Sequence, residues 1–109
     1  MTDAGVDASE RPKIVCLCGS LRFQHLFQSE RQRLTAQGVI VLGPETISEE
    51  LTPSIRAALA ELHLRRIDLA DEVRVVSEGG YLGSATQGEI EYARRKCKAI
   101  SSVELNLDL

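Results

Sequence analysis

The chain has 109 residues, the size of a single domain, and 43% of them are hydrophobic, which is more than a disordered chain carries. Its formal net charge of -3 argues against a protein that binds nucleic acid polymers, because such proteins are usually basic. No apolar run is long enough to span a membrane and the start of the chain lacks a secretory signal pattern, so a cytoplasmic location is expected.

The first half of the chain alternates between apolar runs and amphipathic segments. Residues 1–11 lack periodicity and are predicted to form a disordered tail, which leaves a single domain over residues 12–109. Residues 13–18 fit a buried strand. A helix with apolar side chains at helical spacing follows and is expected to stop at Gly38, and residues 39–42 are predicted to form a second buried strand.

The second half repeats this alternation. Thr52 and Pro53 are typical of a helix start, with Thr52 as the N-cap and Pro53 in the first turn. The apolar stripe of this helix is assigned to Ile55, Leu59, Leu62 and Ile67. Strands are predicted at residues 73–76 and 99–103, with a helix from about residue 85 to 96 between them. Residues 104–109 either extend the last strand or form an exposed tail.

Alternating strands and helices predict an α/β domain. The expected architecture is a small doubly wound parallel sheet, Rossmann-like or flavodoxin-like, with four to five strands. Ligands of such sheets bind at the carboxyl ends of the strands. Here those ends are rich in glycine, at Gly19-Ser20, Gly43-Pro44 and residues 79–84.

The turn after the first strand is one candidate site, with the sequence Cys18-Gly19-Ser20-Leu21-Arg22. Gly19 would let a ligand approach the backbone, Ser20 would bind a hydroxyl or phosphate, and Arg22 would hold a phosphate through its planar guanidinium. An ordinary strand-to-helix turn capped by Ser20 is the alternative. A nucleotide P-loop is excluded, because the Gly-Lys-Ser/Thr ending is missing.

The segment 79–92 is the second candidate, because a glycine loop leads there into a helix. Ser84 and Gln87 have the spacing of a capping box, which predicts Ser84 as the helix N-cap. Such a loop offers backbone N–H groups and the positive end of a helix to an anionic ligand. The sequence therefore predicts ligand binding around Gly83 and Ser84.

Glu89 is the candidate reactive carboxylate of that helix. Glu91 has Arg94 and Arg95 three and four residues later, so surface ion pairing explains it, whereas Glu89 has no basic neighbour at either spacing. The two carboxylates point about 200° apart on a helix, so only one can face the ligand. Glu89 would act as a nucleophile or general base, with an exposed helix glutamate as the alternative.

His63 and the cysteines complete the list of candidates. His63 titrates near neutral pH and is an acid/base candidate, with a packed or surface histidine as the alternative. Cys16 and Cys18 share one face of a strand, and with Cys97 they are interpreted as small core residues. No metal and no cofactor are predicted, because zinc would need further ligands at close spacing.

The order of these motifs over residues 13–102 resembles the nucleoside 2-deoxyribosyltransferase-like family, and above all its small bacterial and phage members. That family includes nucleoside deoxyribosyltransferases and nucleotide N-glycosidases. The likeness lies in the Cys-Gly-Ser-x-Arg turn, in a helix that runs into Ala70-Asp71 before an apolar strand, and in Gly83-Ser84-Ala85-Thr86 leading to Glu89-Ile90-Glu91-Tyr92-Ala93.

The resemblance implies cleavage of the N-glycosidic bond of a nucleoside or nucleoside 5′-monophosphate, or transfer of its sugar. Glu89 matches the nucleophile, Ser20 and Arg22 match positions near the sugar or phosphate, and Ser84 lies in the phosphate loop. His63 stands where the family has a catalytic Asp and is expected to assist the departing base. A non-catalytic nucleotide or sugar-phosphate binding module with the same cleft is the alternative. The family also implies a homodimer or higher homo-oligomer.

Overall fold

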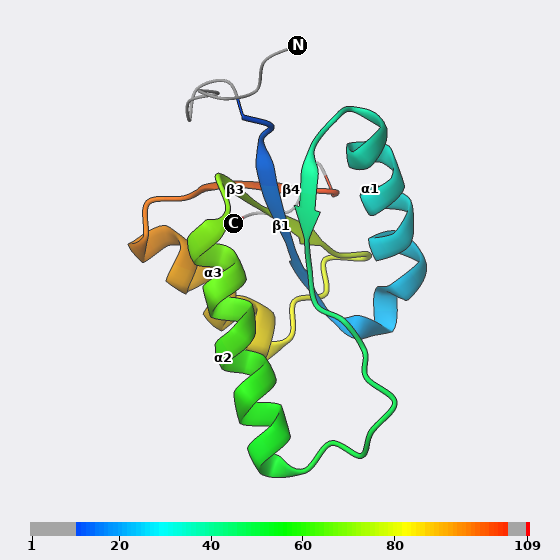
Figure 1. Ribbon diagram of the computed structural model, residues 1–109, viewed down its shortest axis with the longest axis vertical. Helices are drawn as coiled ribbons and strands as arrows, with labels where there is room; N and C mark the ends of the chain where they lie inside the picture. The colour runs from blue at the N-terminus through cyan, green and yellow to red at the C-terminus, as the bar shows by residue number, and fades with distance from the viewer. Residues whose placement is uncertain (1–10, 105–108) are drawn as a thin grey trace.

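Four parallel strands form one sheet in the computed structural model, which describes residues 11–104 and 109 (Figure 1). The strand order is β2-β1-β3-β4, and the strands are β1 (Ile14–Gly19), β2 (Ile40–Leu42), β3 (Glu72–Val76) and β4 (Ala99–Ser102). The parallel α/β prediction is confirmed. The predicted tail over residues 1–11 lies outside the described residues except for Arg11, which forms a 2.7 Å ion pair with Asp71. Residues 105–108 also lie outside them.

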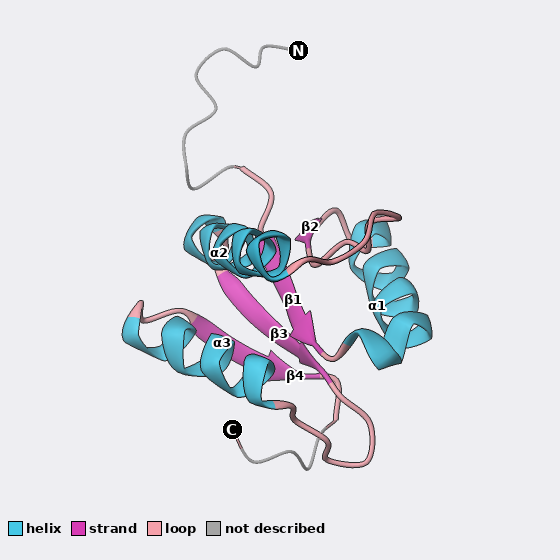
Figure 2. Ribbon diagram, turned by 90° about the horizontal axis from the view of Figure 1, so that it is seen from below, coloured by secondary structure: helices cyan, strands magenta, loops and turns pink. Residues whose placement is uncertain are grey.

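Helices cover both faces of the sheet. A 3-10 turn, η1 (Leu21–Phe23), leads into α1 (Gln24–Ala36), and the other helices are α2 (Pro53–Leu69) and α3 (Ser84–Arg95). Figure 2 shows α1 on one face and α2 and α3 together on the other. No helix in the described part of the chain is long and apolar enough to cross a membrane.

Alternation along β1 creates two hydrophobic cores. Val15 and Leu17 face α1 and pack in one cluster with Phe23, Phe27, Leu34 and Val76. Cys16 and Cys18 face the opposite way and pack with residues of α2 and α3, in a cluster with Ile67, Ala70, Val73, Val75, Ile90 and Ala93. Because side chains alternate across a strand, β1 supplies both layers.

Two predicted burial patterns are wrong. Strand β2 is an edge strand and is only partly buried, with Ile40 exposed, because it pairs with β1 alone. Leu62 is 47% exposed and does not belong to the inward stripe of α2, where His63 and Ile67 are the buried residues. The helix start is confirmed, since the Ile55 N–H donates to the Thr52 hydroxyl at 3.2 Å.

Arg74 interrupts the apolar pattern of β3 and lies on the sheet face that α1 covers. The carboxylate of Glu30 in α1 binds both Arg74 and Arg33. These guanidinium groups lower the pKa of Glu30 to about 2, although partial burial opposes them. Arg74 therefore joins the sheet to α1 through an ion pair with Glu30.

The glycine pair after β3 has a different role from the predicted one. Gly79 and Gly80 have positive φ values of 67° and 77°, and their N–H groups donate to the Glu104 carboxylate at 2.9 Å each. A carboxylate from the chain's own C-terminal segment thus occupies the N–H groups expected to meet a ligand. These glycines do not line the cleft described below.

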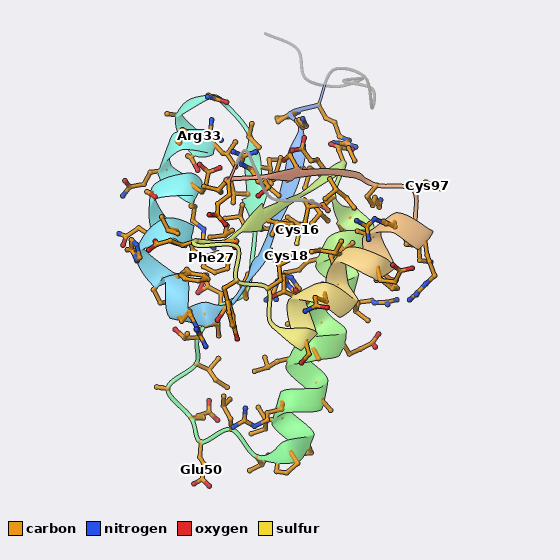
Figure 3. The ribbon with its side chains drawn as sticks, turned by 180° about the vertical axis from the view of Figure 1, so that it is seen from behind. Cys16, Cys18, Phe27, Arg33, Glu50 and Cys97 are labelled. Atoms are coloured by element: carbon orange, nitrogen blue, oxygen red, sulfur yellow. The ribbon has the colours of Figure 1, made fainter. Side chains whose placement is uncertain are left out.

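The two ends of α3 correct two further predictions. Its N-cap is Gly83, not Ser84, and the Gln87 side chain donates to the Leu82 carbonyl at 2.8 Å instead of completing a capping box. Cys97 is exposed, not a core residue (Figure 3), and it follows the last turn of α3 with a left-handed φ of 57°. Its N–H donates to the Arg94 carbonyl at 2.9 Å and ends the helix.

Candidate functional site

A cleft of about 460 Å³ lies at the carboxyl ends of β1 and β3. In the order β2-β1-β3-β4 the chain leaves β1 towards one side of the sheet and returns across it to β3, so these ends flank the point where the strand order reverses. The turn after β1, the start of α3 and one face of α2 wall the cleft. A larger hollow of about 620 Å³ lies beside α1, but it contains none of the predicted site residues.

Glu89, His63 and Cys18 meet on the inner side of this cleft. Glu89 Oε1 lies 3.7 Å from His63 Nε2, and Cys18 Sγ lies 3.2 Å from the same nitrogen. The side chain of His63 is 6% exposed and that of Glu89 is 21% exposed, so both are shielded while Glu89 still borders the cleft. His63 Nδ1 is buried and has no hydrogen-bond partner among the described residues.

Burial shifts the pKa values of this group in opposite directions. It raises the pKa of Glu89 to about 7, against a hydrogen bond from Cys18 that lowers it. It lowers the pKa of His63 to about 4, with the positive charge of Arg66 acting in the same direction. The neighbouring Cys16 thiol and burial raise the pKa of the Cys18 thiol.

These shifts define what the group can do at neutral pH. His63 is neutral there, so its contact with Glu89 is not an ion pair, and Cys18 stays a thiol. Glu89 is poised between its acid and carboxylate forms, which suits a residue that exchanges a proton or attacks an electrophile.

Most of the residues predicted to bind a ligand line the cleft. Gly19 and Ser20 border it from the turn after β1, and Gly83 and Ser84 border it from the start of α3. Ser20 is also the N-cap of the 3-10 turn, which was the alternative interpretation of this residue, since its hydroxyl accepts from the Arg22 N–H at 3.3 Å. At the start of α3, the N–H groups of the first helical turn have no acceptor within the helix. This end of α3 is therefore open to an anion.

Arg22 is the exception among these residues. Its guanidinium lies 3.9 Å from the centre of the Tyr81 ring and does not line the cleft. Arg22 therefore supports the cleft wall through Tyr81, which is itself a lining residue.

Glu89 and Glu91 lie on different sides of α3, as their spacing indicated. Glu89 lies beside His63 at the cleft, whereas Glu91 lies 3.7 Å from Arg94 and 4.0 Å from Arg95 on the exposed side. The prediction of a surface ion pair for Glu91 is confirmed. It makes Glu91 a matched control for Glu89 on the same helix.

Two residues of the cleft lining and the contact between Cys18 and His63 were not predicted from the sequence. Arg66 lines the cleft, and it follows His63 by three residues, a helical spacing that marked both as sharing one face. Glu45 comes from the loop after β2, which shows no periodicity in the sequence. The contact of Cys18 with His63 joins residues 45 positions apart, a distance over which no sequence pattern operates.

The sheet topology and the cleft at its switch point define a Rossmann-like α/β protein. The chain has a deoxyribosyltransferase-like fold: it superposes on a 2-deoxyribosyltransferase from Leishmania mexicana with a TM-score of 0.64 and 17% identity, over 85% of this chain and 66% of that one. A conserved protein from Enterococcus faecalis V583 gives a TM-score of 0.58 and 16% identity, over 84% and 62%. This chain thus spans slightly less than two thirds of either protein. No family model and no curated protein matches the sequence.

Proposed function

We propose that the chain cleaves the N-glycosidic bond of a nucleoside or nucleoside 5′-monophosphate, or transfers its sugar, with Glu89 as the reacting group. The observation that carries this proposal is the position of Glu89. It is a shielded carboxylate on the wall of the cleft at the strand switch point, in a chain with a deoxyribosyltransferase-like fold.

The proposed reaction uses Glu89 as a nucleophile. A carboxylate oxygen attacks the anomeric carbon as the C–N bond breaks, and the bonding electron pair leaves with the base, which takes up a proton. Water or a second base then releases the sugar from Glu89. His63, 3.7 Å from Glu89, is the candidate that assists the departing base.

The open end of α3 is the proposed phosphate site. Gly83 and Ser84 border the cleft where the helix presents free N–H groups and its positive end. Arg66 of α2 adds a cation to the cleft wall, and it forms no ion pair with the residues that the structure describes, 11–104 and 109. Ser20, beside Gly19 in the cleft lining, offers a hydroxyl to the sugar.

Base release tests this function directly. The chain is incubated with a panel of nucleosides and nucleoside 5′-monophosphates, and free base is measured by chromatography. Glu89→Gln should abolish release, while Glu91→Gln, which alters only exposed ion pairs on the same helix, should retain it. Equal release by wild type and Glu89→Gln would refute the role of Glu89.

A nucleotide-binding module is the second candidate, and one observation favours it. His63 stands beside Glu89 at the α2 position where the family that the sequence resembles has a catalytic Asp. Among the described residues that line the cleft, the carboxylates are Glu45 and Glu89. This candidate predicts a rise in melting temperature with a nucleoside monophosphate but no release of base. A ligand present at 100 times its Kd would add about 2.7 kcal/mol to the free energy of unfolding.

A further inference from the structure

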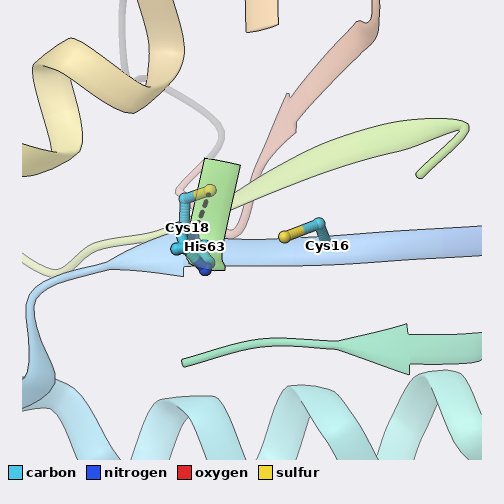
Figure 4. Close-up of side chains that lie close together, drawn as sticks. All are labelled: Cys16, Cys18 and His63. Carbon is cyan, nitrogen blue, oxygen red and sulfur yellow. Dashed lines mark hydrogen bonds between the residues drawn. The ribbon is translucent and has the colours of Figure 1, made fainter. Parts of the chain in front are cut away.

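We propose that Cys16, Cys18 and His63 form a binding site for a thiophilic divalent cation of the Zn²⁺ type, directly behind Glu89. Sequence spacing alone argued against such a site, because no third ligand stands near the two cysteines. The fold supplies that ligand from α2, and Figure 4 shows the ring of His63 next to the Cys18 sulfur, with Cys16 further along the same strand.

The separations of the three ligating atoms fit a metal centre. The two sulfurs and a ring nitrogen of His63 lie within 4.8 Å of one another, and Cys18 Sγ is 3.2 Å from His63 Nε2. In a tetrahedral zinc site with bonds of about 2.0–2.3 Å, ligand atoms are roughly 3.5–3.8 Å apart. The observed separations bracket that range, so small side-chain rotations would bring the three atoms around one ion.

The chemistry of the donors selects the cation. Two thiols and a neutral imidazole are soft and borderline ligands, which favour Zn²⁺ over Mg²⁺ or Ca²⁺. Both thiols would bind as thiolates and release their protons to solvent. The two negative charges formed would balance the charge of the ion, and a Glu89 carboxylate in the fourth position would give the site one net negative charge.

Glu89 supplies the fourth position and the route of entry. Its Oε1 lies 3.7 Å from His63 Nε2 on the side facing the cleft, and carboxylate oxygen is a normal zinc ligand. The cysteines are fully buried, so the ion would enter from the cleft past Glu89. Glu89 lies outside the group of three ligand atoms that are within 4.8 Å of one another, so its side chain would have to turn further towards the cysteines to complete a tetrahedral set with Cys16, Cys18 and His63.

Cation binding would inhibit the proposed reaction in the cleft. A Glu89 carboxylate that ligates the ion is no longer free to attack a sugar carbon, so Zn²⁺ would inhibit base release. This consequence rests on the proposed function, whereas the metal site stands on the ligand geometry alone.

Titration with Co²⁺ tests the site without any activity measurement. The reduced full chain is titrated with Co²⁺, which gives sulfur-to-cobalt charge-transfer absorption and intense visible bands in a tetrahedral thiolate site. We expect these bands to saturate at one equivalent and to disappear when Zn²⁺ is added. Cys16→Ser, Cys18→Ser and His63→Gln should each weaken Co²⁺ binding by about tenfold or more. Cys97→Ser, which changes the exposed thiol, should leave it unchanged.

A second measurement does not depend on the folding of the ligand variants. Zn²⁺ at one equivalent should raise the melting temperature of the wild type and of Cys97→Ser, and Mg²⁺ should raise neither. A wild-type chain that gives no charge-transfer band and no Zn²⁺-dependent shift refutes the proposal. So does a band that is lost in Cys97→Ser. Failure of base release alone would refute the proposed function and leave the metal site standing.

Discussion

The carboxylate of Glu104 accepts a hydrogen bond from the backbone N–H of Gly80 at 2.9 Å, and the N–H of Gly79 donates to its other oxygen at the same distance. The hydrogen bonds from the Gly80 N–H, the Ser77 hydroxyl and the Gly79 N–H all lower the pKa of Glu104. The glycine loop is thus stabilised from inside the chain, and the ligand cleft begins only at Tyr81 and Gly83.

Replacing the Glu104 carboxylate should loosen this loop. Glu104→Gln keeps the shape but loses the negative charge that two backbone N–H groups and a hydroxyl share, so the melting temperature should fall. Thermal unfolding followed by circular dichroism measures the change. Glu91→Gln is the control with a smaller expected effect, because its arginine partners are exposed. Equal shifts in the two variants would show that the loop does not depend on Glu104.

Gly19 should tolerate no side chain. A Cβ at this position would lie 2.3 Å from the backbone carbonyl oxygen of Val76, the residue of β3 that pairs with Gly19 of β1. Gly19→Ala should therefore cost about 2 kcal/mol or more in urea unfolding, because the strand ends must separate. Gly88→Ala is the matched control: its Cβ would meet nothing within 4 Å in α3, and it should stabilise the helix by about 0.5–1 kcal/mol.

Cys97 adopts a backbone conformation that favours glycine. Its φ of 57° follows α3, where an L side chain costs about 1–2 kcal/mol. Cys97→Gly should raise the free energy of unfolding by about 1 kcal/mol, measured by urea denaturation. Cys97→Ser should give no such gain, since serine keeps a Cβ. A gain from both variants would point to the thiol and not to the backbone.

The Glu30 ion pairs should make stability depend on pH in the acid range. The folded pKa of about 2 lies below the ordinary value of 4.5. The contribution is therefore complete above about pH 4.5 and is lost as the pH falls towards 2. We expect about 2 kcal/mol, because Glu30 is mostly shielded while Arg33 is partly exposed. Urea unfolding at several pH values should show a shallower decline for Glu30→Gln, and an unchanged slope would contradict this assignment.

Arg66 should contribute to ligand affinity. If the cleft holds a nucleoside monophosphate, Arg66→Ala removes a cation from the cleft lining and should weaken binding about tenfold, as expected for one charge-assisted contact. Calorimetric titration with the monophosphate and with the unphosphorylated nucleoside separates the phosphate contribution. Arg56→Ala on the same helix, outside the cleft lining, should not change affinity. A loss that is equal for both ligands would place Arg66 away from the phosphate.

Local patterns in the sequence determined the architecture of this chain. Short apolar runs predicted all four strands, the first two of which lead directly into a glycine, and Thr52 with Pro53 marked the start of α2, because strand burial and helix capping depend on near neighbours. The contrast between Glu89 and Glu91 was also readable, since i+3 and i+4 partners lie on one helix.

Tertiary structure alone decided the contacts between distant segments. It brought Cys18 next to His63, placed Glu104 on the Gly79–Gly80 loop and moved Arg22 onto Tyr81. Each of these contacts depends on how helices and loops dock on the sheet, and docking joins residues with no common period. The sequence therefore determined which strand ends form the cleft, and packing determined which side chains meet inside it.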